Sequence, residues 1–361
     1  MENDSTHSSI TDDHELLRLM VSDARAQRDV YRPGPYWSRK TKNAVNQIGR
    51  HGLADFRGAS SSIGLSFTDS IHVDVRHDLA SGFRRPLKFL FETVFPFKNV
   101  FAAQVSLTAS YAAEARRLKN LLLAADDHVR ELLMRYKLPC SLSGGCVDYL
   151  ELDGRKTSTH YLNLLHQHDQ LTKHYDFRSA TSMLEIGGGF GVNVHLLLEN
   201  YPKLKKVVYL DIPPNLYVGT QYLKSFYGKA VVDYRDSREL QSLVFSPHDT
   251  REILAIAPWQ VEKLALNIDL IYNAHSFVEM PQFVVSNYAD KLARLSQFES
   301  ATVLMLTYDC FDLRTTLDPE LLPSFFPTKT FHRSTFPVLD RSYNVITFVG
   351  RQKRASGQQA A

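Results

Sequence analysis

Short apolar runs alternate with amphipathic stretches along the second half of the chain, from about residue 181 onward. Five of these runs do not alternate polar and apolar residues, so they are typical of parallel strands that are buried on both faces. The five runs are TSMLEIG, KKVVYLDI, REILAIA, IDLIYN and ATVLMLTYD. Strands interleaved with helices indicate βαβ units, and the pattern therefore predicts an α/β fold with a doubly wound, Rossmann-like sheet.

Three further segments bear on this sheet. KTFHRSTFPV and SYNVITFVGR are separated by a short polar turn near the end of the sequence, which predicts a terminal hairpin rather than another βαβ unit. KAVVDY is a competing candidate for the third strand, and its pattern leaves that choice open.

The first half of the chain has helical spacing instead. HELLRLMVSDARAQRDVY places apolar residues at helical intervals after Asp12 or Asp13, either of which can cap a helix. Turn signals then flank a short helical piece at residues 42–49, and helix-forming residues fill 107–136 and 158–175. We therefore expect a mainly helical N-terminal domain over residues 1–150, disordered for about its first 12 residues, and an α/β domain over residues 151–361.

Composition narrows the class of protein. The 361 residues are 44% hydrophobic, enough for one full-sized core and a smaller second one, and a formal charge of +3 does not mark a nucleic-acid binder. Cys140, Cys146 and Cys310 lack CxxC spacing, so neither a disulfide framework nor a zinc site is indicated. No apolar run approaches the roughly 20 residues of a membrane span. We expect a cytoplasmic protein with a small-molecule substrate and no metal, and a homodimer is left open.

A glycine-rich turn follows the first of the predicted strands. In MLEIGGGFGVNVHLLL the strand ends at Glu185 and Ile186, and a helix begins near Val192. Glycine allows the backbone to approach a ligand closely, and a helix N-terminus offers N–H groups to its carboxylate. The residues assigned to ligand binding here are Glu185, Gly187, Gly189, Phe190 and Gly191. The alternative is an ordinary glycine-rich turn of an α/β protein.

The charge beside this turn discriminates between cofactors. A dinucleotide-binding turn would have a GxGxxG pattern, but Val192 stands where its last glycine would be. Glu185 would also repel a diphosphate, whereas it suits the cationic ammonium and sulfonium of S-adenosylmethionine (SAM). The predicted cofactor is therefore SAM.

The ends of the next two strands are expected to hold the rest of the cofactor. Asp211 lies 20 positions after Gly191, where a carboxylate can accept hydrogen bonds from both ribose hydroxyls, and Ile212 follows it. The alternative role for Asp211 is to cap the helix that starts near Pro213. Pro258 and Trp259 could supply an apolar slot for adenine, although a lone Trp is as often core, and Asp233 competes for the adenine side.

Reactive groups are expected after the fourth strand. LIYNAHSFVEM places Asn273, Ala274 and His275 at the sheet edge where the sulfonium should lie. His275 titrates in the range needed to take a proton from a hydroxyl, and a helix beginning near Ser276 would put Glu279 within reach of its ring. His275 is preferred as the base over Glu279. Asp309, after the fifth strand, is a third candidate.

Two other clusters have less specific patterns. His160, His166, His168 and His174 lack metal-ligand spacing, which favours a substrate-facing or solvated helix over a metal site. Basic and aromatic residues mix between 31 and 57, a composition suited either to phosphate and stacking contacts or to an ordinary basic surface. They are Tyr31, Arg32, Tyr36, Trp37, Arg39, Lys40, Arg50, His51, Phe56 and Arg57.

Residues 180 to about 285 resemble the sugar O-methyltransferase family of bacterial polysaccharide and natural-product gene clusters. The resemblance is carried by LEIGGGFGVNVHLLLENYPKLKKVVYLDIPPNLYVGTQYLKSFYG, APWQVEKL and NAHSFVEMP. It implies a sugar hydroxyl as the methyl acceptor and SAM held by Glu185, the three alternate glycines and Asp211. It also implies a reaction centre lined by Ser276, Phe277, Glu279 and Met280.

The expected function is methyl transfer from SAM to a hydroxyl of a sugar or a sugar-containing natural product. A phenolic or polyketide hydroxyl is the nearest alternative, because the aromatic N-terminal region suits it equally. A catalytically silent SAM-binding protein is an alternative from a different class. An NAD-dependent dehydrogenase is disfavoured by Val192 and Glu185.

Overall fold

The computed structural model describes residues 10–54, 56–57, 126–137, 142–146, 149–152, 155–309, 315–339 and 343–353. The disorder expected for the first residues and most of the helix expected over 107–136 lie outside this part of the chain. Within it, α7 (Asp126–Arg135) occupies the end of that second segment.

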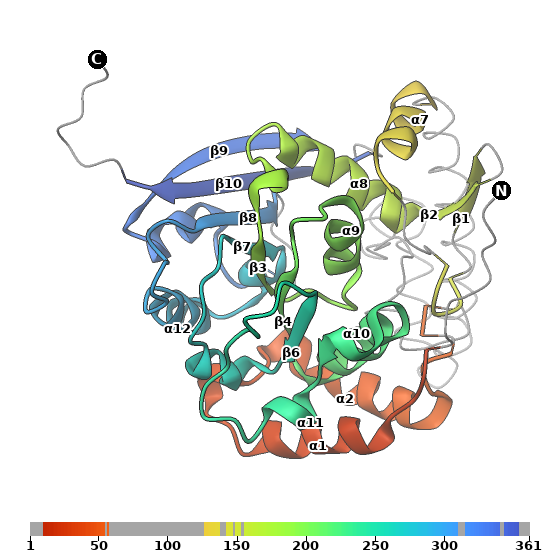
Figure 1. The fold of residues 1–361 in the computed structure, drawn as a ribbon, viewed down its shortest axis with the longest axis vertical. Coiled ribbons are helices and arrows are strands. Elements are labelled where there is room, and N and C mark those ends of the chain that lie inside the picture. Colours follow the sequence, from red (N-terminus) through yellow and green to blue (C-terminus); the bar gives the residue numbers. More distant parts are fainter. Residues whose placement is uncertain are drawn as a thin grey trace, which may run out of the picture.

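The described residues form a twisted sheet of eight strands in the order β5-β6-β4-β3-β7-β8-β10-β9 (Figure 1). Neighbouring strands from β5 to β8 pair in parallel. The strands are β3 (Ser182–Ile186), β4 (Lys206–Leu210), β5 (Val231–Val232), β6 (Glu252–Ile256), β7 (Leu270–Ala274), β8 (Thr302–Tyr308), β9 (Lys329–Pro337) and β10 (Asn344–Gln352). All five predicted parallel strands are present, and the predicted Rossmann-like α/β fold is confirmed.

The remaining predicted strands lie at the two ends of the sheet. β9 and β10 form the expected antiparallel hairpin, and β10 pairs antiparallel with β8. KAVVDY contributes only the two residues of β5, which lies outside β6. The third strand of the large sheet in chain order, β5, is therefore a short edge strand. REILAIA forms the interior strand β6, which pairs with β4. A small antiparallel hairpin of β1 (Tyr149–Leu152) and β2 (Arg155–Ser158) precedes the large sheet.

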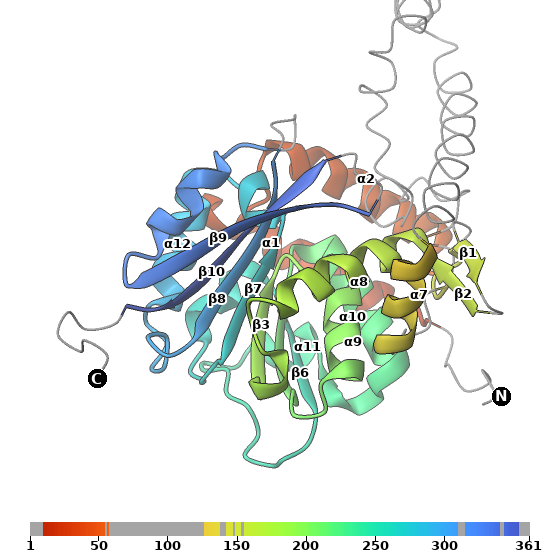
Figure 2. The same cartoon turned by 90° about the horizontal axis from the view of Figure 1, so that it is seen from above.

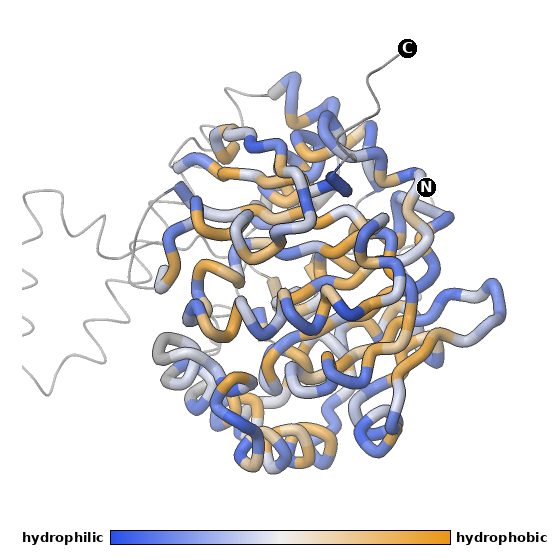
Figure 3. Tube along the Cα trace, turned by 90° about the vertical axis from the view of Figure 1, so that its left-hand side faces the viewer, coloured by the Kyte–Doolittle hydropathy of each residue, from blue (hydrophilic) through white to orange (hydrophobic). Residues whose placement is uncertain are grey.

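Helices cover both faces of the sheet (Figure 2). One face packs beneath α8, α9 and α10, and the other beneath α12 and the 3₁₀ helices η5 to η7. Apolar residues gather in the strands between these layers (Figure 3). The helices are α8 (Thr159–Thr172), η3 (Phe177–Ser179), α9 (Val192–Asn200), α10 (Pro213–Tyr227), η4 (Gly228–Ala230), α11 (Tyr234–Ser237), η5 (Pro258–Lys263), η6 (Ser276–Glu279), α12 (Gln282–Leu292) and η7 (Pro319–Phe325).

The N-terminal helices α1 (His14–Arg25) and α2 (Pro35–His51) belong to the same core as the sheet. α1 contacts α10 and α11, and α2 contacts α10 (Figure 1). Asp13 caps α1, since its side chain accepts a hydrogen bond from the Leu16 N–H. The division into domains at residue 150 stays a prediction, because residues 58–125 lie outside the described part.

The short helix expected over residues 42–49 is wrong in extent, because α2 already begins at Pro35. The sequence YRPGPYW signals a turn, but proline is favoured at the first position of a helix, where its missing N–H has no helical partner. Gly34 is the residue that caps this helix. Trp37 is consequently held on a helix rather than in a loop.

Within the described residues, no helix combines the length and the apolar character needed to cross a membrane.

We predict that Met20→Ala lowers the free energy of unfolding by about 2 to 4 kcal/mol, because the Met20 side chain is fully buried in the core shared by α1 and the sheet. Urea titration measures this change, and Arg18→Ala on the exposed side of the same helix is the control. A loss below about 0.5 kcal/mol, the size of an ordinary surface effect, would mean that α1 is not part of the cooperative core.

Candidate functional site

The glycine turn between β3 and α9 has the backbone that its sequence predicts. Gly187, Gly189 and Gly191 have φ angles of 75°, 60° and 85°, a region that favours glycine. A Cβ at Gly187 would lie 2.1 Å from the Ser276 Oγ, whereas a Cβ at Gly189 would meet nothing within 4 Å. The turn is thus packed against Ser276 at Gly187 and open at Gly189.

Glu185 lies buried just below this turn and is 2% exposed. It pairs in register with Tyr209 of β4 and Tyr272 of β7, so its carboxyl group lies between two buried strands. Its Oε1 accepts a hydrogen bond from Asn193 Nδ2 at 2.8 Å. Its Oε2 is buried and accepts no hydrogen bond from the described part of the chain. Burial raises the pKa of Glu185 to about 7, and the Asn193 bond only partly offsets this.

Asp211 follows β4 and closes against the glycine turn. Its Oδ2 accepts a hydrogen bond from the Gly189 N–H at 2.7 Å, and its Oδ1 accepts one from the Ile212 N–H at 2.7 Å. Burial is the main cause that raises the pKa of Asp211 to about 7, and the charge of Glu185 adds to it. Two buried carboxyl groups therefore share the carboxyl edge of the sheet, which favours a cationic ligand over an anionic one.

Asn273, at the end of β7, joins the two central strands. Its Nδ2 donates to the Ile186 carbonyl at 2.9 Å and to the Ser276 Oγ at 2.6 Å, and its Oδ1 accepts from the Phe277 N–H. The Ser276 hydroxyl in turn donates to the Ile186 carbonyl. Asn273 is 1% exposed, so its side chain fixes the edge of the site, while the neighbouring Ala274 is half-buried.

His275 and Glu279 are brought together through Tyr308 at the end of β8. The His275 ring stacks on the Tyr308 ring with centroids 4.2 Å apart and planes 14° apart. The Tyr308 hydroxyl donates to Glu279 Oε1 at 3.4 Å, and Trp37 Nε1 of helix α2 donates to Glu279 Oε2 at 2.8 Å. An imidazole, a phenol and a carboxylate therefore form one cluster at this edge.

The expected helix after His275 is wrong in kind, because residues 276–279 form the short 3₁₀ helix η6 and α12 begins only at Gln282. Pro281 disfavours a helical conformation at the residue before it, which ends the first turn. His275 itself has a φ of 65°, and its side chain makes no capping hydrogen bond. The alternative that His275 caps a helix through its ring is therefore not realised.

Asp309 lies apart from this cluster. Its carboxylate accepts a hydrogen bond from Asn344 Nδ2 at 2.7 Å, and the residue is exposed. The structure thus groups His275 with Glu279 and directs Asp309 toward the start of β10.

The two candidates for the adenine side differ in their contacts. Asp233 is 2% exposed, caps α11 through the N–H groups of Arg235 and Asp236, and pairs with Lys224. Trp259 is partly buried in η5, directly after Pro258, and its Nε1 donates to the Tyr234 hydroxyl at 3.2 Å. The polar atoms of Asp233 are engaged in the fold, whereas Trp259 keeps part of its ring surface accessible.

The ring of Phe190 turns away from the open side of the glycine turn. It packs edge-on against Phe56 and Tyr222, with centroids 5.5 and 5.3 Å away, and the Arg57 guanidinium lies 5.1 Å from its centre. Phe190 is 5% exposed, so its side chain anchors the turn to α10 and to the N-terminal segment.

The histidines of α8 are not on a solvated face, as one interpretation of the sequence had them. His168 is 2% exposed and hydrogen-bonded to the Tyr201 hydroxyl at 2.6 Å. His166 contacts His128 Nε2 through its Nδ1 and the Pro337 carbonyl through its Nε2. Burial lowers the pKa of His168 to about 4. Helix α8 is covered on its other side by α7, which is why polar residues there are internal.

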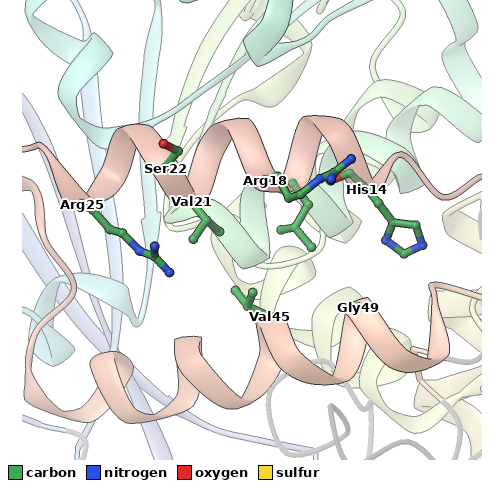
Figure 4. A pocket seen from close by; sticks show the side chains of 8 residues that line it. His14, Arg18, Val21, Ser22, Arg25, Val45 and Gly49 are labelled. Atoms are coloured by element: carbon green, nitrogen blue, oxygen red, sulfur yellow. The ribbon is translucent and has the colours of Figure 1, made fainter.

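A groove of about 500 Å³ lies elsewhere, between α1 and α2 (Figure 4). Leu17, Val21 and Val45 form its apolar part, and Arg18 and Arg25 lie at its border. Its lining includes no residue of the glycine turn or of the His275 cluster. The groove therefore lies apart from the buried carboxyl groups and from the cluster around Tyr308.

Sequence reasoning missed two residues of the site in these roles. Tyr308 was only the end of a strand, and Trp37 was one of many aromatic residues in a basic segment. No local pattern could connect Trp37 to Glu279, since 242 positions separate them. The position of Tyr308 at the carboxyl end of a predicted parallel strand was the one available signal for it.

No protein-family model and no curated protein matches the chain. Solved structures that it resembles include the mitomycin 7-O-methyltransferase MmcR, at 16% identity over 51% of this chain and 52% of that one, with a TM-score of 0.35. A SAM-dependent methyltransferase from Aquifex aeolicus matches at 12% identity over 50% of this chain and 87% of that one, with a TM-score of 0.35. The O-methyltransferase NcsB1 from neocarzinostatin biosynthesis matches at 14% identity over 53% and 55%, again with a TM-score of 0.35.

The matched part spans about half of this chain and about half of MmcR and NcsB1. At these TM-scores the likenesses support no argument about substrate or mechanism. The fold rests on the strand order and pairing of the chain itself.

We predict that Glu185→Gln removes part of the pH dependence of stability. Because the pKa of Glu185 in the folded state is raised to about 7, the folded protein holds this proton more tightly than the unfolded chain does. The wild type should therefore lose stability as pH rises from about 4.5 to about 7. From pH 5 to pH 8, the free energy of unfolding of the Gln variant should therefore rise by roughly 1 to 3 kcal/mol relative to that of the wild type.

Urea unfolding at the two pH values measures this difference. Glu239→Gln is the control, because the Glu239 side chain is 80% exposed. If the free energy of unfolding of Glu185→Gln depends on pH in the same way as that of the wild type, burial does not raise the pKa of Glu185.

Proposed function

We propose that this chain is a SAM-dependent O-methyltransferase that acts on a hydroxyl of a sugar or a sugar-containing natural product. The observation that carries the proposal is Glu185, a carboxylate buried below a glycine turn with one oxygen that accepts no hydrogen bond from the described residues. A buried carboxylate without a full set of partners is costly, and a cationic ligand in the turn would relieve that cost.

The residues at the edge of the sheet fit SAM. Glu185 would pair electrostatically with its ammonium, and the open space at Gly189 would admit its methionine part next to the N-terminus of α9. Asp211, which already orders the turn through the Gly189 N–H, keeps lone pairs for the ribose hydroxyls. Trp259 would border the adenine. The pyrophosphate of NAD fits poorly, because Glu185 puts negative charge directly below the glycine turn, where a pyrophosphate would lie.

The chemistry requires a methyl group to move to the acceptor oxygen while that oxygen loses its proton. SAM, when bound, supplies an electrophilic methyl group. His275 would accept the proton, and Glu279 would hold the hydroxyl and stabilise the imidazolium through Tyr308. Trp37 and Phe277 would help to exclude water, since Trp37 is bonded to Glu279 and Phe277 is fully buried two positions before it in η6.

The acceptor is the finer part of the proposal. The motif GGGFG with YLDIPP and SFVEM supports a sugar through the family resemblance. A phenolic or polyketide hydroxyl is the second candidate, because Trp37 and Tyr308 put aromatic rings on either side of Glu279. A SAM-binding protein without activity is the third possibility, and an acceptor panel separates the three.

We predict that Asp211→Ala weakens SAM binding by about 1 to 3 kcal/mol, because the ribose hydroxyls lose their acceptor and Gly189 loses its tether. Isothermal titration calorimetry measures the change. Asp233→Ala is the matched control, since that carboxylate is engaged by α11 and Lys224, and its SAM affinity should stay within about twofold of the wild type. Equal affinities for the Asp211 variant and the wild type would move the ribose site elsewhere.

We predict that His275→Ala lowers turnover by about 100-fold or more and leaves SAM affinity nearly unchanged. Release of S-adenosylhomocysteine is measured with a panel of nucleotide sugars, glycosylated metabolites and phenols. Turnover confined to the sugars supports the proposed acceptor, and turnover confined to phenols supports the second candidate. If His275→Ala keeps full activity, the base is Glu279. If the wild type binds SAM but methylates no acceptor, the chain is instead a catalytically silent SAM-binding protein.

A further inference from the structure

The segment from Arg28 to Trp37 crosses the carboxyl edge of the sheet. It leaves α1, which packs on α10, reaches η1 (Asp29–Tyr31), which packs on α12, and returns through α2 to α10. Because α10 and α12 cover opposite faces, residues 28–37 must pass over the strand ends between them. We name residues 28–37 the N-terminal strap.

Polar contacts anchor the first half of this strap. The Tyr31 hydroxyl donates to Glu262 Oε1 at 2.6 Å, and Arg28 and Lys291 bind the same oxygen at 2.6 and 2.7 Å. The Lys291 and Tyr31 bonds are the main causes that lower the pKa of Glu262 to about 2. The strap is therefore held to η5 and α12 at a point outside the His275 cluster.

The second half of the strap directly contacts residues 279–281, at the end of η6. Gly34 approaches so closely that a Cβ there would lie 3.2 Å from Pro281 Cδ and 3.6 Å from the Glu279 carbonyl. Three residues later, Trp37 donates its indole N–H to Glu279 Oε2 at 2.8 Å. Of the two donors to this carboxylate described above, Trp37 makes the shorter bond, since Tyr308 lies 3.4 Å from the other oxygen.

This bond matters because Glu279 is only 6% exposed. A buried carboxylate takes its position from its donors, and a charge-assisted hydrogen bond is stronger than a neutral one. The indole N–H can only donate, so its bond has a single direction. With Oε2 held by Trp37 and Oε1 facing Tyr308, the plane of the Glu279 carboxylate has a fixed orientation.

We propose that Trp37 is a positioning residue of the reaction centre, which orients Glu279 toward the acceptor hydroxyl and so brings the end of the N-terminal strap at Trp37 into the catalytic site. The expected effect on turnover rests on the proposed methyl transfer. The hydrogen bond between the Trp37 indole and the Glu279 carboxylate does not depend on that function. The specificity for the acceptor is then shared between the strap and the Rossmann-like sheet.

The link is tested first without any activity. The chain has two tryptophans, so protein labelled with ¹⁵N-tryptophan gives two indole N–H resonances, and Trp37→Phe assigns the one from Trp37. That resonance should lie downfield in the wild type, and Glu279→Gln should move it upfield, because a hydrogen bond to a carboxylate is stronger than one to a neutral amide. The comparison with Glu279→Gln carries the decision, because that variant replaces the charged acceptor of the Trp37 bond with a neutral one.

The functional consequence is tested by a double-mutant cycle. Trp37→Phe keeps a ring but removes the N–H, and it should lower kcat about tenfold with little change in the Kd of SAM. In the Glu279→Gln background the same change should alter kcat by less than about twofold, because Trp37 acts through Glu279. Tyr31→Phe, which loosens the other anchor of the strap, should leave kcat within about twofold of the wild type.

Two results would overturn the proposal. One is a Trp37 resonance with the same position in the wild type and in Glu279→Gln. The other is an equal loss of kcat from Trp37→Phe in both backgrounds. If the wild type methylates no acceptor, the proposed function fails, while the resonance still decides whether Trp37 positions Glu279.

Discussion

The site depends on the burial of one carboxyl group, that of Glu185, at the end of the central strand β3. Its neighbours in register, Tyr209 and Tyr272, exclude water from both sides, and the glycine turn closes above it. A Cβ at Gly188 would lie 2.8 Å from Glu185 Oε2 and from the Tyr209 ring, so a side chain larger than glycine would force these groups apart. Burial, turn geometry and charge are thus consequences of the same packing.

The second carboxyl group, Asp211, extends this arrangement along the strand ends. Its bond to the Gly189 N–H couples the end of β4 to the turn after β3, and the Tyr209 hydroxyl also donates to the Gly189 carbonyl. Asn273 makes the corresponding link from β7 to the Ile186 carbonyl. Three neighbouring strand ends therefore hold one turn, and His275 and Glu279 lie in the segment that follows β7.

Most of the sheet could be predicted from sequence, because buried parallel strands have a distinctive run of apolar residues. Glu185, Asp211 and His275 were found because each directly follows or ends such a run. The roles of Phe190 and the α8 histidines could not be read, since they depend on which helices cover them. The Trp37 to Glu279 contact joins segments far apart in the chain, and it forms only because the N-terminal strap crosses the sheet edge.

The central claim is that the carboxyl edge of β3 and β4 binds SAM. Its most direct test is calorimetric titration of the full chain with SAM, S-adenosylhomocysteine and NAD at a series of pH values. We predict that SAM and S-adenosylhomocysteine bind and that NAD does not. The affinity for SAM should rise roughly tenfold from about pH 5.5 to about pH 7, because a buried carboxyl group ionises over this range. Binding of NAD alone would contradict the central claim.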